Sequence, residues 1–504
     1  MMPAKNKIMI LSGIVLIISL SFRKKQDIPL FPAPANFPKP SYNFSANALT
    51  NEGIELGKTL FYDAIISSDN TISCGSCHQQ SAGFTQHGHA LSHGIDDKLT
   101  RRNSMPLFNL AWSESFGWDG GVHDLDLFAI SPITNPAEMN ESMARVLDKL
   151  RKSQQYPALF KKAFGSEEIN TERFLKALSQ FMLTMVSANS KYDKYMRYEG
   201  VELNETELAG MAIVKQKCAS CHAGELFTDY SFRNNGLTHL PVDDKGRFEV
   251  NQNESDSFKF KVPSLRNLGF TAPYMHDGRF KTLEEVLAHY TSTVESTPFL
   301  DPVLNQNGKT GIMLSKDEQQ KIVSFLRTLD DEDFIKNTRF AENTLTVSIP
   351  KKDIDAEVVN FRPVSGKVKA IFNESIDIYL KIKEAIKTQQ TGIAAKQSDK
   401  LPKVLKKLNS LPLANAEKVF FNTYLEKLSF DCEHIIEGEY STEHQSEHFI
   451  ELSKNFYVLI ASFKPDYSKL YYHRCENSDL NWLSDKINEV FPKNNCDKIQ
   501  TKKL

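Results

Sequence analysis

The chain has 504 residues, of which 25% are charged and 40% hydrophobic, and its formal net charge is -2. A chain of this length exceeds what one hydrophobic core serves, so we expect two or three domains. The nearly balanced charge gives no indication of nucleic-acid binding or of broad membrane-surface binding, and we expect neither.

Residues 1–26 have the pattern of an export signal. Lys5 and Lys7 precede an apolar run from Ile8 to Leu20, which has secretory length and is short for a membrane-spanning helix. No clear small-residue cleavage site follows, so an uncleaved membrane anchor is the alternative to a signal peptide. In both cases we expect the rest of the protein to lie outside the cytoplasm, in a bacterial periplasm.

Residues 27–46 are rich in proline between Phe31 and Pro40 and predict an extended lead-in. A short helix is expected within residues 47–62. The pattern Cys-x-x-Cys-His then occurs twice, first at Cys74, Cys77 and His78 and again at Cys218, Cys221 and His222.

This five-residue pattern is typical of covalent haem attachment. Each thiol can add to one vinyl group of a haem, and the histidine can ligate the iron from one face. A single copy would also suit a redox dithiol or half a zinc site, but the duplication and the trailing histidine count against both. The sequence therefore predicts two covalently bound c-type haems.

Ligand-capable and aromatic residues follow the first motif. The polar loop 84–94 holds His87, His89 and His93, which are either iron ligands or exposed loop residues. Trp112 and Trp118 lie between turn signals and belong either to a cofactor wall or to a plain core.

Helical periodicity dominates the remainder. It is strong from Thr171, and Asn204 with Glu207 is typical of a capping box that opens a helix before the second motif. Further helices are expected at 282–290, 315–329, 366–387, 400–408, 414–426 and 446–463. We predict a mainly α protein with two tandem cytochrome c-like haem domains, 47–200 and 201–340, a linker 341–365 and a C-terminal helical bundle domain 366–504.

Four further motifs accompany the two haem motifs. They are Arg102-Asn103, Trp118-Asp-Gly, Pro136-Ala-Glu138 and Pro273-Tyr-Met-His276-Asp-Gly. Together, over about residues 47–339, they resemble the bacterial di-haem cytochrome c peroxidases and the related MauG-type enzymes.

The resemblance implies that the two haems differ in role. The haem held by Cys74, Cys77 and His78 would react with peroxide, and the haem held by Cys218, Cys221 and His222 would receive electrons. Trp118 would lie between the haems, and Glu138 would move a proton between the peroxide oxygens. The resemblance also implies that His276 is a catalytic residue. Asn103, Thr271 and Pro273 resemble an inter-haem calcium site with oxygen ligands.

The resemblance also suggests further iron ligands. His93 resembles a removable ligand of the first haem, with His87 and His89 as rivals. For the second haem we expect Tyr290, with His289 as the alternative. A phenolate would stabilise ferric iron, unlike a thioether, which supplies no negative charge.

The sequence departs from the family pattern at several positions. Phe128 stands where a distal glutamine is common, Gly121 stands where an arginine often follows Trp-Asp-Gly, and no tryptophan immediately precedes Cys218 as it does in MauG. The leading hypothesis is an exported peroxidase that takes electrons from a small cytochrome c or a cupredoxin and reduces hydrogen peroxide. A homodimer is compatible with this hypothesis. The alternatives are a MauG-like oxidase that acts on a protein or organic substrate, and a non-enzymatic electron carrier.

Three cysteines, Cys432, Cys475 and Cys496, fall in the last quarter of the chain, where at most one disulfide can form among them. This region resembles a helical domain of unknown function that often occurs with bacterial copper-efflux proteins. His473, Cys475 and Cys496 either bind copper or zinc, or the two cysteines form a disulfide.

Overall fold

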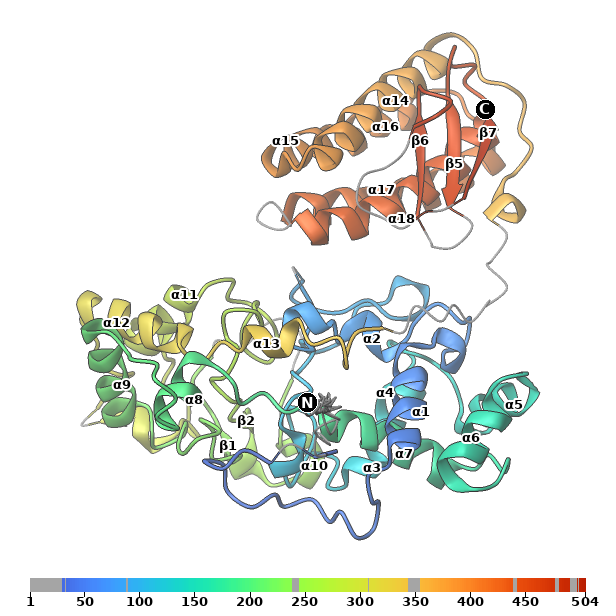
Figure 1. Cartoon of the computed structure of the whole chain (residues 1–504). Coiled ribbons are helices and arrows are strands. Elements are labelled where there is room, and N and C mark those ends of the chain that lie inside the picture. Colours follow the sequence, from blue (N-terminus) through green and yellow to red (C-terminus); the bar gives the residue numbers. More distant parts are fainter. Residues whose placement is uncertain are drawn as a thin grey trace, which may run out of the picture.

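The computed structural model describes residues 30–504 except 32, 88, 238–243, 307, 343–353, 438–441, 476–479, 490–495 and 497. The predicted export signal lies outside the described residues, as do residues 343–353 of the predicted linker. Helices dominate the described part, which confirms the mainly α class (Figure 1). Within that part, no helix is both long and apolar enough to cross a membrane.

The first half of the chain is built around two packed helices, α1 (Asn51–Tyr62) and α7 (Thr171–Thr184). Thr50 and Asn170 cap them, and their apolar faces enter one core. The helices approach closely at Gly57, where a Cβ atom would lie 1.9 Å from the carbonyl oxygen of Ala177. The surrounding helices are α2 (Cys74–Cys77), α3 (Leu125–Phe128), α4 (Ile130–Thr134), α5 (Met143–Lys152) and α6 (Tyr156–Phe164).

The second half repeats this packing. Here α9 (Glu205–Lys217) packs on α12 (Lys316–Arg327), and a Cβ atom at Gly210 would lie 2.0 Å from the carbonyl oxygen of Lys321. A phenylalanine four residues after each contacted carbonyl, Phe181 in one half and Phe325 in the other, borders the same glycine. Each half thus places its own haem motif near a close crossing of two helices.

Short elements complete the second half. They are α8 (Lys191–Met196), α10 (Phe248–Asn251), α11 (Leu283–Ala288), α13 (Glu332–Ile335) and the antiparallel pairs β1 (Phe232–Arg233) with β2 (Phe260–Lys261) and β3 (Asn305–Gln306) with β4 (Lys309–Thr310). The hydrophobic cores do not follow the expected boundaries strictly. Tyr192 packs in the second core, whereas Phe334 and Phe340 return to the first. The hydroxyl of Tyr62 also donates to the carbonyl of Phe340 at 2.7 Å.

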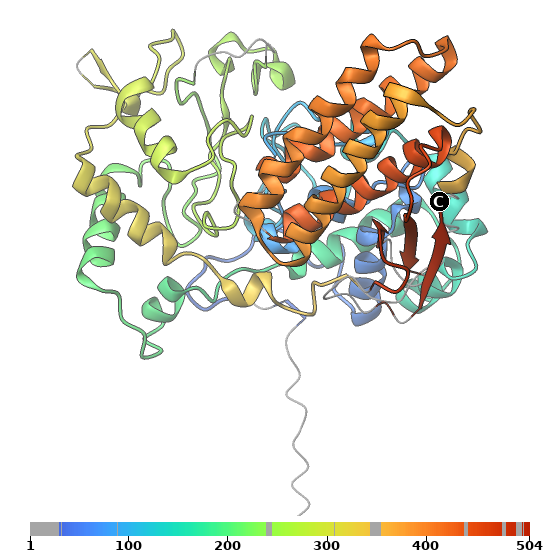
Figure 2. The same cartoon turned by 90° about the horizontal axis from the view of Figure 1, so that it is seen from above.

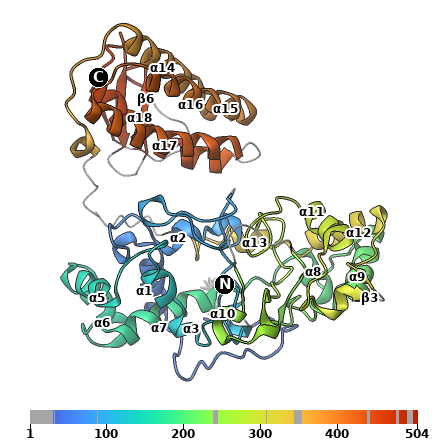
Figure 3. The same cartoon turned by 180° about the vertical axis from the view of Figure 1, so that it is seen from behind.

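The C-terminal region has its own hydrophobic core and lies above the first half rather than the second (Figures 1 and 2). Its helices are α14 (Gly366–Lys387), α15 (Thr391–Ser398), α16 (Lys400–Leu405), α17 (Asn415–Glu437) and α18 (Thr442–Phe463). The predicted helix 366–387 is confirmed, whereas α17 runs eleven residues beyond the predicted end at 426. The rear view in Figure 3 shows α17 and α18 on the side that faces α2.

The C-terminal helical domain also contains a sheet, which the sequence did not predict. An antiparallel sheet in the order β6-β5-β7 closes it, formed by β5 (Tyr471–Cys475), β6 (Asn481–Ser484) and β7 (Ile499–Lys503). Tyr472 pairs with Leu483, and His473 pairs with Trp482. All four residues of β6 are buried, so this strand lacks the alternation of apolar and polar residues that identifies a strand in a sequence.

One buried ion pair anchors α8 within the second half. Asp193 of α8 accepts two hydrogen bonds from Arg266, at 2.8 and 2.9 Å, and neither side chain is exposed. We expect Asp193→Ala to lower the free energy of unfolding by about 3–5 kcal/mol, because it leaves the arginine buried without its partner. Denaturant unfolding of the haem-loaded protein, followed through its haem absorbance, measures this. Glu332→Ala, which breaks the exposed pair with Lys336, is the control and should have almost no effect.

Candidate functional site

The first motif forms a single helical turn, α2, with its histidine just beyond. Ser73 caps the turn in a capping box with Ser76. The Nδ1 atom of His78 lies 2.8 Å from the carbonyl oxygen of Phe84, and burial lowers the pKa of the ring. A neutral ring that donates through Nδ1 leaves the lone pair of Nε2 for a metal.

The second motif follows the end of α9 and has the same arrangement. The Nδ1 atom of His222 lies 3.2 Å from the carbonyl oxygen of Phe227 and 3.1 Å from that of Pro263. Burial lowers the pKa of this ring as well. Both histidines are therefore held as neutral ligands with Nε2 available.

The thiols of both motifs are unlike those of redox dithiols. Burial raises the pKa of Cys74 and Cys77 to about 12, and that of Cys218 to about 11. Redox-active dithiols need a thiolate near neutral pH and have a lowered pKa. The raised pKa values count against a thioredoxin-like role and fit thiols that are held in place for attachment to a haem.

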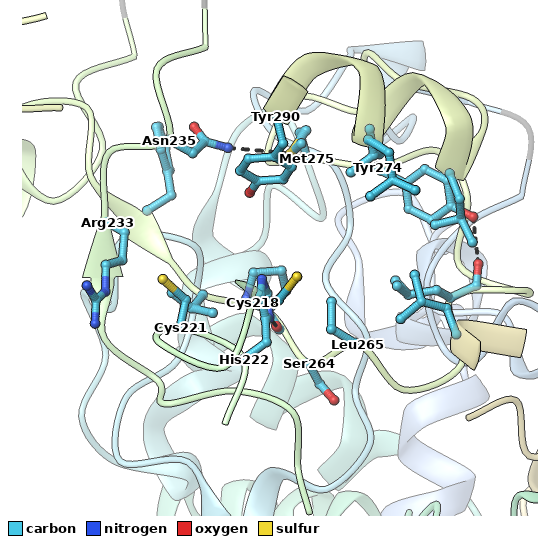
Figure 4. Close-up of a pocket in the computed structure, with 18 of the residues that line it drawn as sticks. Cys218, Cys221, His222, Arg233, Asn235, Ser264, Leu265, Tyr274, Met275 and Tyr290 are labelled. Atoms are coloured by element: carbon cyan, nitrogen blue, oxygen red, sulfur yellow. Dashed lines mark hydrogen bonds between the residues drawn. The ribbon is translucent and has the colours of Figure 1, made fainter. Parts of the chain in front are cut away.

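A cavity opens beside the second motif, and it is lined mainly by apolar side chains of the second half (Figure 4). Cys218, Cys221 and His222 lie along one side in this view, and Tyr290 lies across from them with its hydroxyl directed into the cavity. Burial raises the pKa of Tyr290 to about 12. Leu283, Leu287 and Leu326 contribute to the wall.

The backbone explains why Tyr290 and not His289 faces the cavity. Helix α11 continues as a single π-helical turn, His289–Thr293, a feature often found at functional sites. His289 is turned away, because its Nδ1 lies 3.0 Å from the hydroxyl of Thr293 and its Nε2 lies 3.1 Å from the carbonyl of Asn235. Both ring nitrogens of His289 are thus engaged by the protein.

Trp118 and His276 lie at the edge of the same cavity, on the side of the first half. The indole of Trp118 donates to the carbonyl of Asn103 at 2.8 Å, and its ring lies 6.5 Å from that of His276. His276 stacks on Phe260 at 3.6 Å, and burial lowers its pKa to about 4, so it is neutral at physiological pH. Phe260 was not predicted from the sequence, and it reaches the site through the pairing of β2 with β1.

Glu138 lies beside the first motif. Burial raises the pKa of its carboxyl, and its charge in turn contributes to the raised pKa of Cys77. The amide of Asn135 donates to Oε1 of Glu138 at 2.6 Å. Gly94 packs directly against the backbone of Glu138, where a side chain on the glycine would clash.

The three residues of the expected calcium site line the cavity together. The peptide bond between Ala272 and Pro273 is cis, and Thr271 directly precedes it. The backbone amide of Asn103 donates to the carbonyl of His276 at 2.8 Å. All three residues thus border this cavity, and the calcium site, which needs hard oxygen donors, stays a prediction.

The three loop histidines do not share one environment. His87 lies 3.0 Å from the hydroxyl of Ser81. His89 and His93 instead turn toward the C-terminal domain, where the ring of His93 packs at 4.1 Å from that of Phe430. The backbone of His93 stays close to the first motif, with its carbonyl 3.8 Å from the sulfur of Cys77.

Comparison with known proteins decides the family. Residues 51–200 match the family model described as di-haem cytochrome c peroxidase. The methylamine utilization protein MauG of Methylorubrum extorquens is 36% identical over 305 residues, which cover 60% of this chain and 84% of that protein. This chain belongs to the di-haem cytochrome c peroxidase and MauG family. It is an oxidoreductase with two haem cofactors, as the resemblance implied.

Other relatives agree with this assignment. Cytochrome c551 peroxidase of Nitrosomonas europaea is 39% identical over 293 residues, covering 56% of this chain and 81% of that protein. A solved MauG-like protein associated with microbial copper homeostasis is 30% identical with a TM-score of 0.56, covering 62% of this chain and 98% of that chain. Residues 376–468 match a family described as a protein of unknown function, consistent with the resemblance of the C-terminal region.

The metal alternative at His473, Cys475 and Cys496 was wrong. Cys475 and Cys496 form a disulfide that joins the end of β5 to the segment before β7. His473 is buried and engages Thr501 through Nδ1 at 2.9 Å and the carbonyl of Lys486 through Nε2 at 3.0 Å. The side chains that soft metals would need are therefore already committed.

This disulfide closes a loop with a sequence separation of 21. We expect the Cys475→Ser/Cys496→Ser double variant to lose about 3 kcal/mol of stability in the C-terminal domain, because the unfolded chain regains the entropy of that loop. Thermal unfolding at constant pH measures the loss, and peptide mapping without reductant should recover the linked pair. Cys432→Ser is unsuitable as a control because that thiol is fully buried; exposed Ser410→Ala serves instead.

Proposed function

We propose that this chain is an exported di-haem peroxidase that reduces hydrogen peroxide to water with electrons from a small cytochrome c or a cupredoxin. The observation that carries the proposal is the difference between the two haem motifs. A half-buried carboxyl, Glu138, lies beside the first, and a tyrosine hydroxyl faces the second across a cavity.

The two motifs hold the cofactors. Cys74 and Cys77 attach one haem with His78 as its iron ligand, and Cys218, Cys221 and His222 do the same for the other. When bound, the haems supply the redox-active iron and store oxidising equivalents. The neutral imidazoles and protonated, buried thiols of the chain fit this use.

Glu138 moves the proton that peroxide cleavage requires. Its raised pKa lets the carboxyl take a proton from one peroxide oxygen and return it to the other. Asn135 fixes Oε1, so the carboxyl keeps one orientation. Because Phe128 replaces the usual amide and packs on Phe116, the proton-transfer role falls to Glu138.

Tyr290 would hold the iron of the second haem through its phenolate oxygen when that haem is bound. A phenol with a raised pKa loses its proton when it binds a metal, and the resulting charge favours ferric iron. His289 supports the turn by its two hydrogen bonds. His93 is the removable ligand proposed for the first haem, with His87 and His89 as the alternatives.

Trp118 carries electrons between the halves. Its ring lies between the cavity and the first half and is oriented by Asn103. His276, neutral and stacked on Phe260, keeps this wall rigid. Calcium bound by Asn103, Thr271 and Pro273 would fix the same region. Residues 47–200 and 201–340 act as the two haem domains, in the periplasm.

A MauG-like oxidase that acts on a protein or organic substrate is the second candidate. Two relatives named MauG and the tyrosine at position 290 favour it. The residue before Cys218 counts against it. This residue is Lys217, whose ammonium pairs with Glu318 at 2.6 Å, and an ammonium side chain cannot pass oxidising equivalents to a surface substrate.

Glu138→Gln separates proton transfer from haem binding. We expect peroxide-dependent oxidation of reduced cytochrome c to fall about 100- to 10,000-fold, because the amide cannot carry the proton, while the haem content stays at two per chain. Steady-state kinetics measure the fall. The exposed Glu114→Gln variant should keep full activity. Unchanged turnover in Glu138→Gln would refute the assigned role.

Tyr290→Met tests the ligand of the second haem. Exchange of a phenolate for a thioether removes a negative charge, so we expect the reduction potential of one haem to rise and its ferric spectrum to change. Spectroelectrochemical titration measures both quantities. Tyr198→Met is the matched control, since it makes the same exchange at an exposed tyrosine that does not line the cavity. Equal spectra for wild type and Tyr290→Met would contradict the assignment.

A further inference from the structure

Four histidines from distant parts of the chain meet where the C-terminal domain contacts the first half. His89 and His93 come from the loop after the first haem motif, His434 from α17 and His448 from α18. Ligand-capable nitrogens of His89, His93 and His434 all lie within 4.8 Å of one another. The Nε2 atoms of His89 and His448 are 3.1 Å apart.

The cluster is partly shielded from water. His89 and His434 are buried, with relative exposures of 5% and 9%. The ring of Phe430 packs at 4.1 Å from both His93 and His434. A set of imidazoles beneath an aromatic cover is a setting in which a metal ion binds without competing solvent.

We propose that His89, His93 and His434 bind a divalent transition-metal ion, zinc or copper(II), with His448 as the fourth ligand. Imidazole nitrogen suits these ions, whereas calcium and magnesium need oxygen donors. The site is separate from both haem motifs and from the oxygen-rich calcium site. Nitrogen ligands of one tetrahedral zinc ion lie about 3.4 Å apart, so the rings need to close by about 1 Å.

The carboxylate of Asp431 lies next to the proposed fourth ligand, His448. Oδ1 of Asp431 lies 3.8 Å from Nδ1 of His448, on the ring edge opposite the nitrogen that faces His89. The other oxygen of Asp431 accepts from the amide of Asn455 at 3.0 Å. Metal-binding histidines commonly have such a carboxylate at the second ring nitrogen, where it fixes the tautomer.

Metal binding at this place would join the C-terminal domain to the first haem's surroundings. The loop that carries His89 and His93 continues to Gly94 and Ile95, and the amide of Ile95 donates to the carbonyl of Glu138 at 2.8 Å. While His93 binds this ion, its imidazole cannot also act as the removable iron ligand of the first haem. That consequence rests on the proposed function, whereas the metal site does not.

Metal analysis of the haem-loaded, full-length protein tests the site. After treatment with a chelator and desalting, the protein is titrated with zinc chloride or copper(II) sulfate and the bound metal is measured by mass spectrometry. We expect one zinc or copper ion per chain in addition to two irons. With copper(II), we expect nitrogen hyperfine structure in the electron paramagnetic resonance spectrum.

Variants on the C-terminal helices make the test specific. His434→Ala should abolish stoichiometric binding, and the isosteric Asp431→Asn should weaken the affinity about 10- to 100-fold. His123→Ala, at an exposed histidine outside the cluster, is the control and should bind like wild type. Haem absorbance and thermal unfolding report whether each variant folds.

Two results would overturn the proposal. One is a wild-type protein that binds no zinc or copper tightly after chelation. The other is binding that is equally tight in wild type and in folded Asp431→Asn and His434→Ala. The Glu138 and Tyr290 variants report only on the haems, whereas the His434 and Asp431 variants report on bound zinc or copper. Failure of the metal site can therefore be distinguished from failure of the peroxidase assignment.

Discussion

The hydrogen bond from a buried histidine ring to a backbone carbonyl is the interaction on which both haem sites depend. It fixes Nδ1 of His78 on Phe84 and Nδ1 of His222 on Phe227 and Pro263, and so leaves Nε2 for iron in each half. The carbonyls are in place because each half folds around a pair of helices that cross at a glycine. Helix packing, turn geometry and ligand orientation are thus consequences of one repeated arrangement.

The two halves differ in the residue that lies near the haem motif, which is Glu138 in the first half and Tyr290 in the second. The proposed difference in chemistry rests on these two residues. Glu138 is held beside the first motif by Asn135, and its burial makes it a better proton carrier than an exposed carboxylate. Tyr290 faces the second motif because a π turn rotates the chain at His289. Trp118, anchored on Asn103, stands at the boundary. Under the proposed function, the first site carries out proton-coupled chemistry and the second supplies electrons.

Much of this could be predicted from the sequence, because haem attachment depends on local spacing. The two motifs, the capping box at Asn204 and the helix at 366–387 are local patterns, and the structure has these elements. The choice between His289 and Tyr290 needed the structure, because adjacent residues differ only in the direction imposed by the backbone. The sheet after residue 470 was missed because β6 is buried throughout. The meeting of His89 and His93 with His434 depends on contacts between residues more than 300 positions apart, which spacing cannot reveal.

The central claim is that the two haems are unequal, one open to peroxide beside Glu138 and one closed by Tyr290. Low-temperature electron paramagnetic resonance of the resting ferric protein tests this most directly. Our account predicts one high-spin signal that disappears on addition of peroxide and one low-spin signal. Two low-spin signals that are unaffected by peroxide would contradict it.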